Sequence, residues 1–134
     1  MRNITPIFVI ATLTVLFISC GDDEVGPLVG TWTLVKEIYA DCNDTDPETY
    51  IYDCAVSIDE CIKYTFTKDG KFSISFSATG LIEGTYSSSG NQITITLNNY
   101  QQSNIFYTYT LSGSTLTLKQ EYDGCDITKT FNKS

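Results

Sequence analysis

The chain has 134 residues, 16 of them acidic and 8 basic, so its formal net charge is −8, and it contains no histidine. This length is typical of a single domain, and the acidic balance argues against a nucleic-acid-binding protein, which needs a face rich in Lys and Arg. The lack of histidine excludes Ser-His-Asp and Cys-His catalysis and His-ligated metal sites, and five cysteines indicate an oxidising compartment or a modification.

The N-terminal segment 1–19 has the pattern of a secretory signal. A single charge at Arg2 precedes an uncharged run over 6–18, which at ~1.5 Å per residue is too short to cross a ~30 Å hydrocarbon core. The run ends Leu16-Phe17-Ile18-Ser19-Cys20-Gly21, which resembles the signal of bacterial lipoproteins. That resemblance implies cleavage before Cys20 and a lipid on its sulfur. A buried N-terminal helix with a chance cysteine is the alternative.

Residues 20–27 are then expected to form an acidic tether between the lipid and the domain. The run Asp22-Asp23-Glu24 resembles the surface-export tag of Bacteroidetes lipoproteins, and a solvated tether that is merely acidic is the alternative. The resemblance implies a lipid anchor in the outer membrane on the cell surface, with the periplasmic face as the alternative. The membrane is therefore the first expected partner.

Over 28–134 hydrophobic and polar side chains alternate with a period of two, as in Phe72, Ile74 and Phe76. This pattern predicts antiparallel strands with one polar face, and turn signals such as Asp69-Gly70 divide them. Eight strands are predicted near 29–40, 61–68, 71–79, 81–88, 91–98, 104–111, 115–122 and 126–132. We therefore expect an all-β fold, an eight-stranded antiparallel up-and-down barrel, with a flattened sandwich as the alternative.

Four motifs of this domain, in order, resemble one family. They are Gly30-Thr31-Trp32, Tyr64-Thr65-Phe66-Thr67-Lys68-Asp69-Gly70, Gly84-Thr85-Tyr86 and Leu116-Thr117-Leu118. Their order is similar to that in the small lipocalin-like domains of Bacteroidetes lipoproteins, and Gly-x-Trp opens the first strand of lipocalins. The resemblance covers essentially all of 28–132 and implies a barrel with one open, ligand-binding mouth. Lipocalins commonly place an Arg against the motif Trp, for which this chain offers only Lys129 or Lys133.

The mouth is expected at the end of the barrel that carries 41–60, because the longer connections gather there, and Trp32 is expected at the closed end. Segment 41–60 holds seven acidic residues and no basic one and is predicted to be a long loop. It lacks the glycine and the bidentate glutamate that an EF-hand calcium loop requires. A solvated acidic loop is the favoured interpretation.

Four cysteines remain after Cys20 and are expected to gather at the rim of the mouth as two disulfides. They are Cys42, Cys54, Cys61 and Cys125, and their three possible pairings stay open. A zinc site built from them would lack the closely spaced pairs that such sites use. No metal site and no cofactor are predicted.

No catalytic residue is predicted, and the chain is not expected to be an enzyme. The strand acids Glu37, Glu83 and Glu121 are expected to point outward into solvent. The expected function is to bind or carry a small hydrophobic ligand as a monomer, in contact with inward-facing residues of the barrel: Tyr64, Phe66, Phe72, Phe76, Tyr86, Tyr107 and Tyr109.

Two alternatives stay open. The same aromatic side chains could instead fill the barrel. The protein would then be a surface-exposed module that contacts another protein or a glycan through tyrosines near the mouth, namely Tyr39, Tyr50, Tyr52, Tyr100 and Tyr122.

Overall fold

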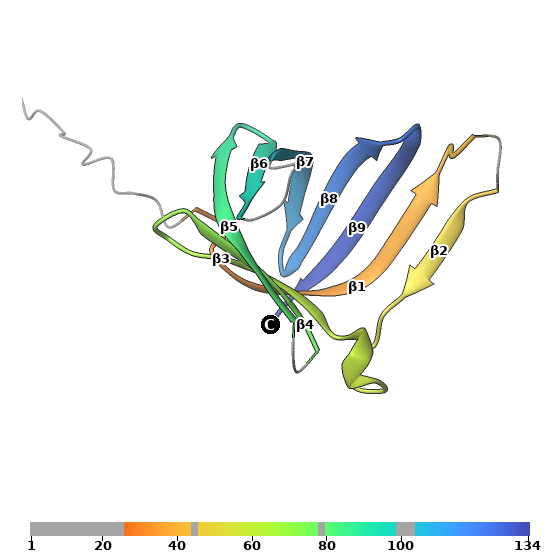
Figure 1. Cartoon of the computed structure of the whole chain (residues 1–134), viewed down its shortest axis with the longest axis horizontal. Helices are drawn as coiled ribbons and strands as arrows, with labels where there is room; N and C mark the ends of the chain where they lie inside the picture. The colour runs from red at the N-terminus through yellow and green to blue at the C-terminus, as the bar shows by residue number, and fades with distance from the viewer. Residues whose placement is uncertain (1–25, 44–45, 78–79, 99–103) are drawn as a thin grey trace, which may run out of the picture.

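The computed structural model describes residues 26–43, 46–77, 80–98 and 104–134. The signal segment, Cys20, residues 21–25 of the acidic tether and Tyr100 lie outside these residues. The described elements, in chain order, are β1 (Gly30–Ala40), β2 (Glu48–Ile51), the 3-10 helix η1 (Ile58–Glu60), β3 (Ile62–Phe66), β4 (Lys71–Phe76), β5 (Gly80–Ser89), β6 (Gln92–Leu97), β7 (Asn104–Ser112), β8 (Thr115–Tyr122) and β9 (Cys125–Lys133) (Figure 1). Within those ranges no helix has the length and apolar character needed to span a membrane.

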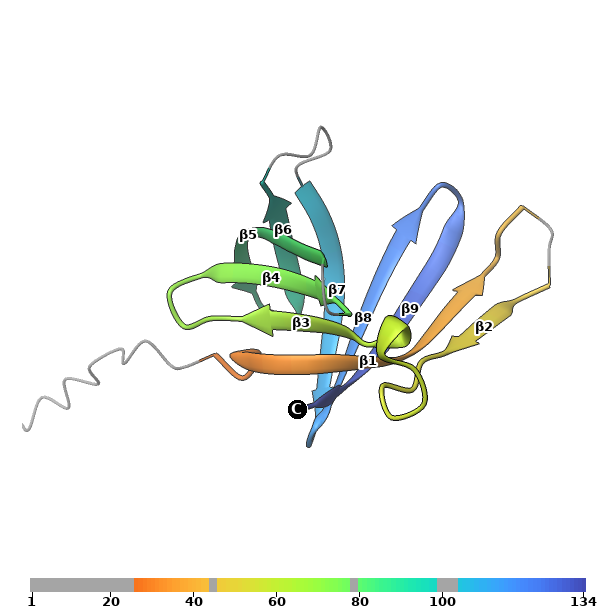
Figure 2. The same cartoon turned by 60° about the horizontal axis from the view of Figure 1, so that its bottom comes forward.

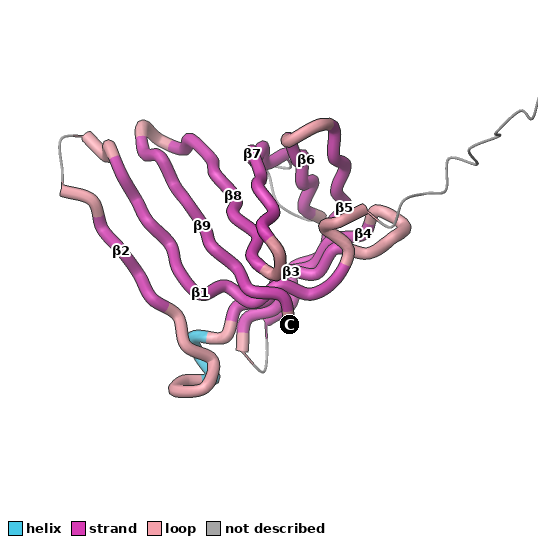
Figure 3. Tube along the Cα trace, turned by 180° about the vertical axis from the view of Figure 1, so that it is seen from behind, coloured by secondary structure: helices cyan, strands magenta, loops and turns pink. Residues whose placement is uncertain are grey.

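The strands form one antiparallel sheet that closes on itself. Strands β3 to β8 each pair with the next strand along the chain, and β9 pairs with β1 over most of its length. The other edge of β1 is shared, because β3 pairs with Gly30–Thr33 and β2 pairs with Lys36–Tyr39. The predicted eight-stranded barrel is confirmed, and β2 is added to it. Figure 3 shows β2, β1, β9 and β8 side by side in one continuous sheet.

Strand β2 corrects the prediction that 41–60 is a single long loop. Its four residues are all exposed, so no alternation of buried and exposed side chains marks it in the sequence. What holds it is its hydrogen-bonded pairing with the second half of β1. A four-residue strand without this alternation can be identified only from its pairing with a neighbouring strand.

The barrel is closed at one end and splayed at the other. Pairing of β3 with β1 stops at Thr33, and pairing of β7 with β8 stops at Thr108 and Lys119. Beyond these points the sheet separates, and Figure 2 shows the β8–β9 and β1–β2 pairs fanning away from β3 and β4. The molecule therefore has a closed half around Trp32 and an open half around the last residues of β1 and the first residues of β9.

Side chains pack the closed half. Its fully buried members include Trp32, Phe66 and Phe131, and Tyr64 contacts the ring of Phe131 with ring centroids 4.7 Å apart. The Trp32 indole nitrogen donates to the carbonyl oxygen of Leu28 at 2.7 Å. Lys133, one of the two lysines named above, lies with its ammonium 5.3 Å from the Trp32 ring centroid, so it occupies the position where lipocalins commonly have arginine.

Two disulfides join the four cysteines, Cys42 to Cys125 and Cys54 to Cys61. The first links the segment just after β1 to the first residue of β9, and the second closes the short loop that leads into β3. They lie at opposite ends of β2, so the expectation that all four thiols share one rim is wrong. The reason is that β3 starts beside the middle of β1 rather than beside its end. All four thiols are oxidised in these bridges, so in this state they are not available as zinc ligands.

Candidate functional site

A β-bulge in β1 turns a carboxylate into the barrel. Leu34 pairs with Phe131 and Lys36 pairs with Thr130, so Val35 is an extra residue on β1. Before the bulge the even-numbered residues face inward, and after it the odd-numbered ones do, since one residue of shift exchanges the two faces of a strand. Glu37 is therefore only 6% exposed, and the expectation that it points into solvent is wrong. Glu83 and Glu121 are exposed.

Glu37 is the centre of a buried polar network. Its Oε1 is paired with the ammonium of Lys129, which lies directly opposite on β9, and its Oε2 accepts a hydrogen bond from the hydroxyl of Tyr52 at 2.6 Å. The side chains of both charged partners are largely buried. The network thus joins β1, β9 and the segment that follows β2, and the buried negative charge is compensated.

Two buried tyrosines of the packed core are close enough to Glu37 for its charge to act on them. Tyr64 and Tyr107 are hydrogen-bonded to each other through their hydroxyls and are both nearly inaccessible. Burial raises the pKa of Tyr107 to about 12, and burial raises the pKa of Tyr64 well above its ordinary value. The negative charge of Glu37 raises the pKa of both. Both phenols are therefore protonated and uncharged at neutral pH.

We expect the protein to lose stability as the pH rises from 10 towards 12. In the unfolded chain Tyr107 ionises near pH 10, whereas burial holds its folded-state pKa at about 12. Its contribution is complete below pH 10 and is lost as the pH passes through this window, because the unfolded chain then releases a proton that the folded chain keeps. Urea midpoints measured at several alkaline pH values test this. In Tyr107→Phe the decline should be shallower, and an identical decline would contradict the assignment.

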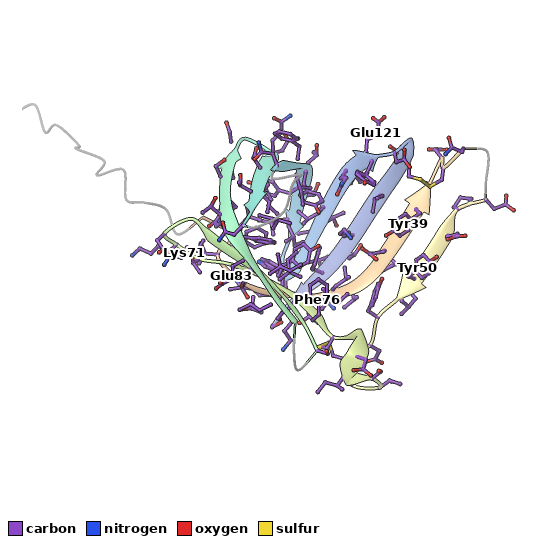
Figure 4. All side chains as sticks on the ribbon, viewed as in Figure 1. Tyr39, Tyr50, Lys71, Phe76, Glu83 and Glu121 are labelled. Carbon is purple, nitrogen blue, oxygen red and sulfur yellow. A yellow bond between two sulfur atoms is a disulfide. The ribbon has the colours of Figure 1, made fainter. Side chains whose placement is uncertain are left out.

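The inner face of β1 and β2 forms a groove beside the ion pair. It has a volume of about 190 Å³ and is lined by Glu37, Tyr39, Glu48, Tyr50 and Tyr52. The rings of Tyr39 and Tyr50 meet edge to face, with centroids 5.7 Å apart and planes at 87°. Figure 4 shows these two tyrosines on neighbouring strands of the splayed half, away from the crowded core. Tyr50 is 47% exposed, so the groove is open to solvent.

The side chains that line the groove give it a negative electrostatic potential. The Tyr50 hydroxyl donates to Glu48 Oε2 at 2.6 Å, and this bond and the charge of Glu48 raise the pKa of Tyr50. Burial and then the charge of Glu37 raise the pKa of Tyr39. None of the described residues that line the groove is basic, and Lys129 is engaged with Glu37 from the neighbouring strand. A positively charged or neutral group is therefore favoured there over an anion.

The residues predicted to contact a ligand lie mainly in the packed core. Phe66 packs against Phe72 and Tyr86, with ring centroids 5.1 and 5.0 Å apart, and the Tyr86 hydroxyl donates to the carbonyl oxygen of Thr67 at the closed end. Phe76 and Tyr109 are partly buried against the same core. Their inward orientation follows the predicted alternation, but none of these five lines the groove.

The sequence predicts the three tyrosines of the groove to lie near the mouth, but it does not predict that Glu37 and Glu48 line the same groove. Tyr39, Tyr50 and Tyr52 were placed near the mouth because they adjoin or belong to segment 41–60. Glu37 was missed because the bulge at Val35 arises from the pairing of β1 with β9. Across the described part of the chain, no cluster of three His, Cys, Asp or Glu side chains could hold a metal ion.

Comparisons with known proteins agree with this architecture. A family model described as a lipocalin-like domain matches residues 28–118. A lipocalin-like protein from Bacteroides uniformis superposes with a TM-score of 0.55 at 22% identity, over 80% of this chain and 98% of that one. An uncharacterized protein from Bacteroides eggerthii superposes with a TM-score of 0.53 at 18% identity, over 80% of this chain and 99% of that one. These likenesses show the fold. No curated protein matches the chain.

Proposed function

The chain belongs to the lipocalin-like domain family, and on that basis we propose that it is a lipid-anchored binding protein for a small ligand with an apolar body. The observation that carries this proposal is the difference between the two halves of the barrel. Packed aromatic rings fill the closed half, whereas the open half keeps a tyrosine-lined groove. A ligand would lie in the open half, with its apolar part against aromatic side chains and its polar part near the hydroxyls and carboxylates.

Anchoring through Cys20 is the second part of the proposal and is supported by the sequence. The lipoprotein-like segment 16–21 and the acidic run after it favour a lipid anchor in the outer membrane with the domain on the cell surface. The periplasmic face remains the alternative orientation. An anchor of several acyl chains holds a protein firmly, because each buried CH₂ contributes about 0.8 kcal/mol.

An exposed apolar surface beside the groove favours a second candidate function, a module that contacts a protein or a glycan. Ile51, Val56 and Ile58 are 67%, 81% and 65% exposed, and they lie within the short stretch from β2 to η1. Three large aliphatic side chains exposed so close together in the chain are a feature of interaction surfaces. In this function the groove would form part of a larger contact surface.

Native mass spectrometry of the protein solubilised from its own membrane tests the proposal. We expect a mature chain that begins at Cys20 and carries acyl chains, together with a bound small molecule of constant mass. Tyr50→Ala should reduce the bound fraction, because Tyr50 lines the groove. Leu81→Ala, which removes an exposed apolar side chain from β5, should leave it unchanged.

Three outcomes would contradict it. Protein recovered without any bound molecule would overturn ligand binding and favour the interaction module. Equal loss in Tyr50→Ala and Leu81→Ala would place the ligand elsewhere. A mature chain without acyl chains would overturn the anchor.

A further inference from the structure

We propose that the groove between β1 and β2 binds an organic cation with apolar substituents on its nitrogen, such as a methylated ammonium head group. This inference rests on the proposed ligand-binding function and names the polar part of the ligand. Its basis is the chemistry of the five lining residues, which are three tyrosines and two glutamates.

The aromatic walls fit a methylated ammonium. Such a cation is attracted to the faces of aromatic rings within about 6 Å, and surrounding it with several rings at steep angles to one another is the usual way to bind it. Tyr39 and Tyr50 supply two rings at 87° with centroids 5.7 Å apart, and Tyr52 supplies a third ring to the same groove. The three tyrosines therefore form an incomplete aromatic cage that is open to solvent.

The hydrogen bonds inside the groove leave ring surface and negative charge for the ligand. The hydroxyls of Tyr50 and Tyr52 donate to Glu48 and Glu37 respectively, each at 2.6 Å. These bonds orient the rings, and they use two of the donors that would otherwise attract an anion. Among the described residues Glu48 forms no ion pair, whereas Glu37 is paired with Lys129. The net charge of the groove is therefore negative.

The size of the groove and its ligand set argue against other occupants. Pockets for whole drug-sized ligands hold about 300–1,000 Å³, so a groove of about 190 Å³ accommodates a head group, with the rest of the molecule in the open half. Both carboxylates of the groove are already hydrogen-bonded to tyrosines, and among the described residues no cluster of three His, Cys, Asp or Glu side chains could hold a metal ion. A weakly hydrated organic cation requires only ring surface and charge.

Comparing choline with neohexanol, its uncharged carbon isostere, shows whether binding depends on the positive charge or only on the shape of the head group. The full chain, solubilised in lauryl maltoside, is titrated with each compound and binding is followed by saturation-transfer NMR. We expect choline to bind at least about fivefold more tightly than neohexanol. Equal binding of the two, tighter binding of neohexanol, or no binding of choline would overturn the inference. A bound small molecule in native mass spectrometry would still uphold the proposed function in each of those cases.

Variants at two exposed positions measure separately what the ring of Tyr50, its hydroxyl and the charge of Glu48 contribute to choline binding. Tyr50→Ala should abolish the preference for choline, Tyr50→Phe should keep most of it, and Glu48→Gln should weaken choline binding without affecting neohexanol. Tyr122→Ala, which removes an exposed tyrosine outside the groove, is the matched control and should bind choline as the wild type does. Equal losses in Tyr50→Phe and Tyr50→Ala would assign binding to the hydroxyl and overturn the cage.

Discussion

Replacing Cys42 and Cys125 together with serine should lower the free energy of unfolding by about 4–5 kcal/mol. Their bridge spans a sequence separation of 83 residues, so it restricts the unfolded chain over β2 to β8. The chain-entropy cost of opening such a loop grows with its length. The loss is a large fraction of the about 5–15 kcal/mol that stabilises a typical domain. Urea denaturation under oxidising conditions measures it.

The second bridge provides a matched control for the first. Cys54 and Cys61 are separated by only 7 residues, so replacing both with serine should cost about 2–3 kcal/mol. In each double variant two cysteines become serines, and only the size of the closed loop differs. A larger loss in the Cys54/Cys61 variant would show that these bridges act through local native contacts rather than through the unfolded chain.

Replacing Lys129 with Met should lower the free energy of unfolding by about 3–5 kcal/mol. The substitution leaves the carboxylate of Glu37, which is 6% exposed, inside the barrel without its cation. Tyr52 still donates one hydrogen bond to it, but a single neutral donor does not replace a charged partner. The shift of the urea midpoint at pH 7 measures this loss.

Two further variants show whether the loss comes from the unpaired charge. Adding Glu37→Gln to Lys129→Met should recover part of the stability, because the amide oxygen still accepts from Tyr52 and no buried charge remains. Lys119→Met removes one positive charge from the exposed face of β8 and should have an effect below about 0.5 kcal/mol. Additive losses at Glu37 and Lys129 would contradict the coupling.

Much of the fold was predictable from sequence because its signals are local. Strands β4, β6 and β8 were recognised from alternation within six to eight residues, and Asp69-Gly70 marks its hairpin without help from the rest of the chain. The lipocalin-like motifs, from Gly30 to Leu118, agree with the family match over 28–118. Strand β2 has no such local signal, since its four residues are all exposed.

The candidate site was only partly predictable because it depends on contacts between distant segments. The tyrosines of segment 41–60 drew attention by composition, but their role follows from the placement of β2 beside β1. Glu37 was assigned to the wrong face, because one extra residue at Val35 reverses the alternation that the sequence pattern implies. Lys129 and Lys133 were equivalent candidates for the contact with Trp32. The register of β9 separates them, since it places Lys129 opposite Glu37 and Lys133 opposite Trp32.

By itself, the sequence determined the fold class, the order of eight strands and the lack of any histidine-based chemistry. These properties depend on residue type and on a two-residue period, which act over short distances along the chain. Only the tertiary structure decided the bulge, the cysteine pairing, the strand β2 and the groove. Each of these depends on which backbone segments pair across the sheet, and that pairing is a property of the closed barrel as a whole.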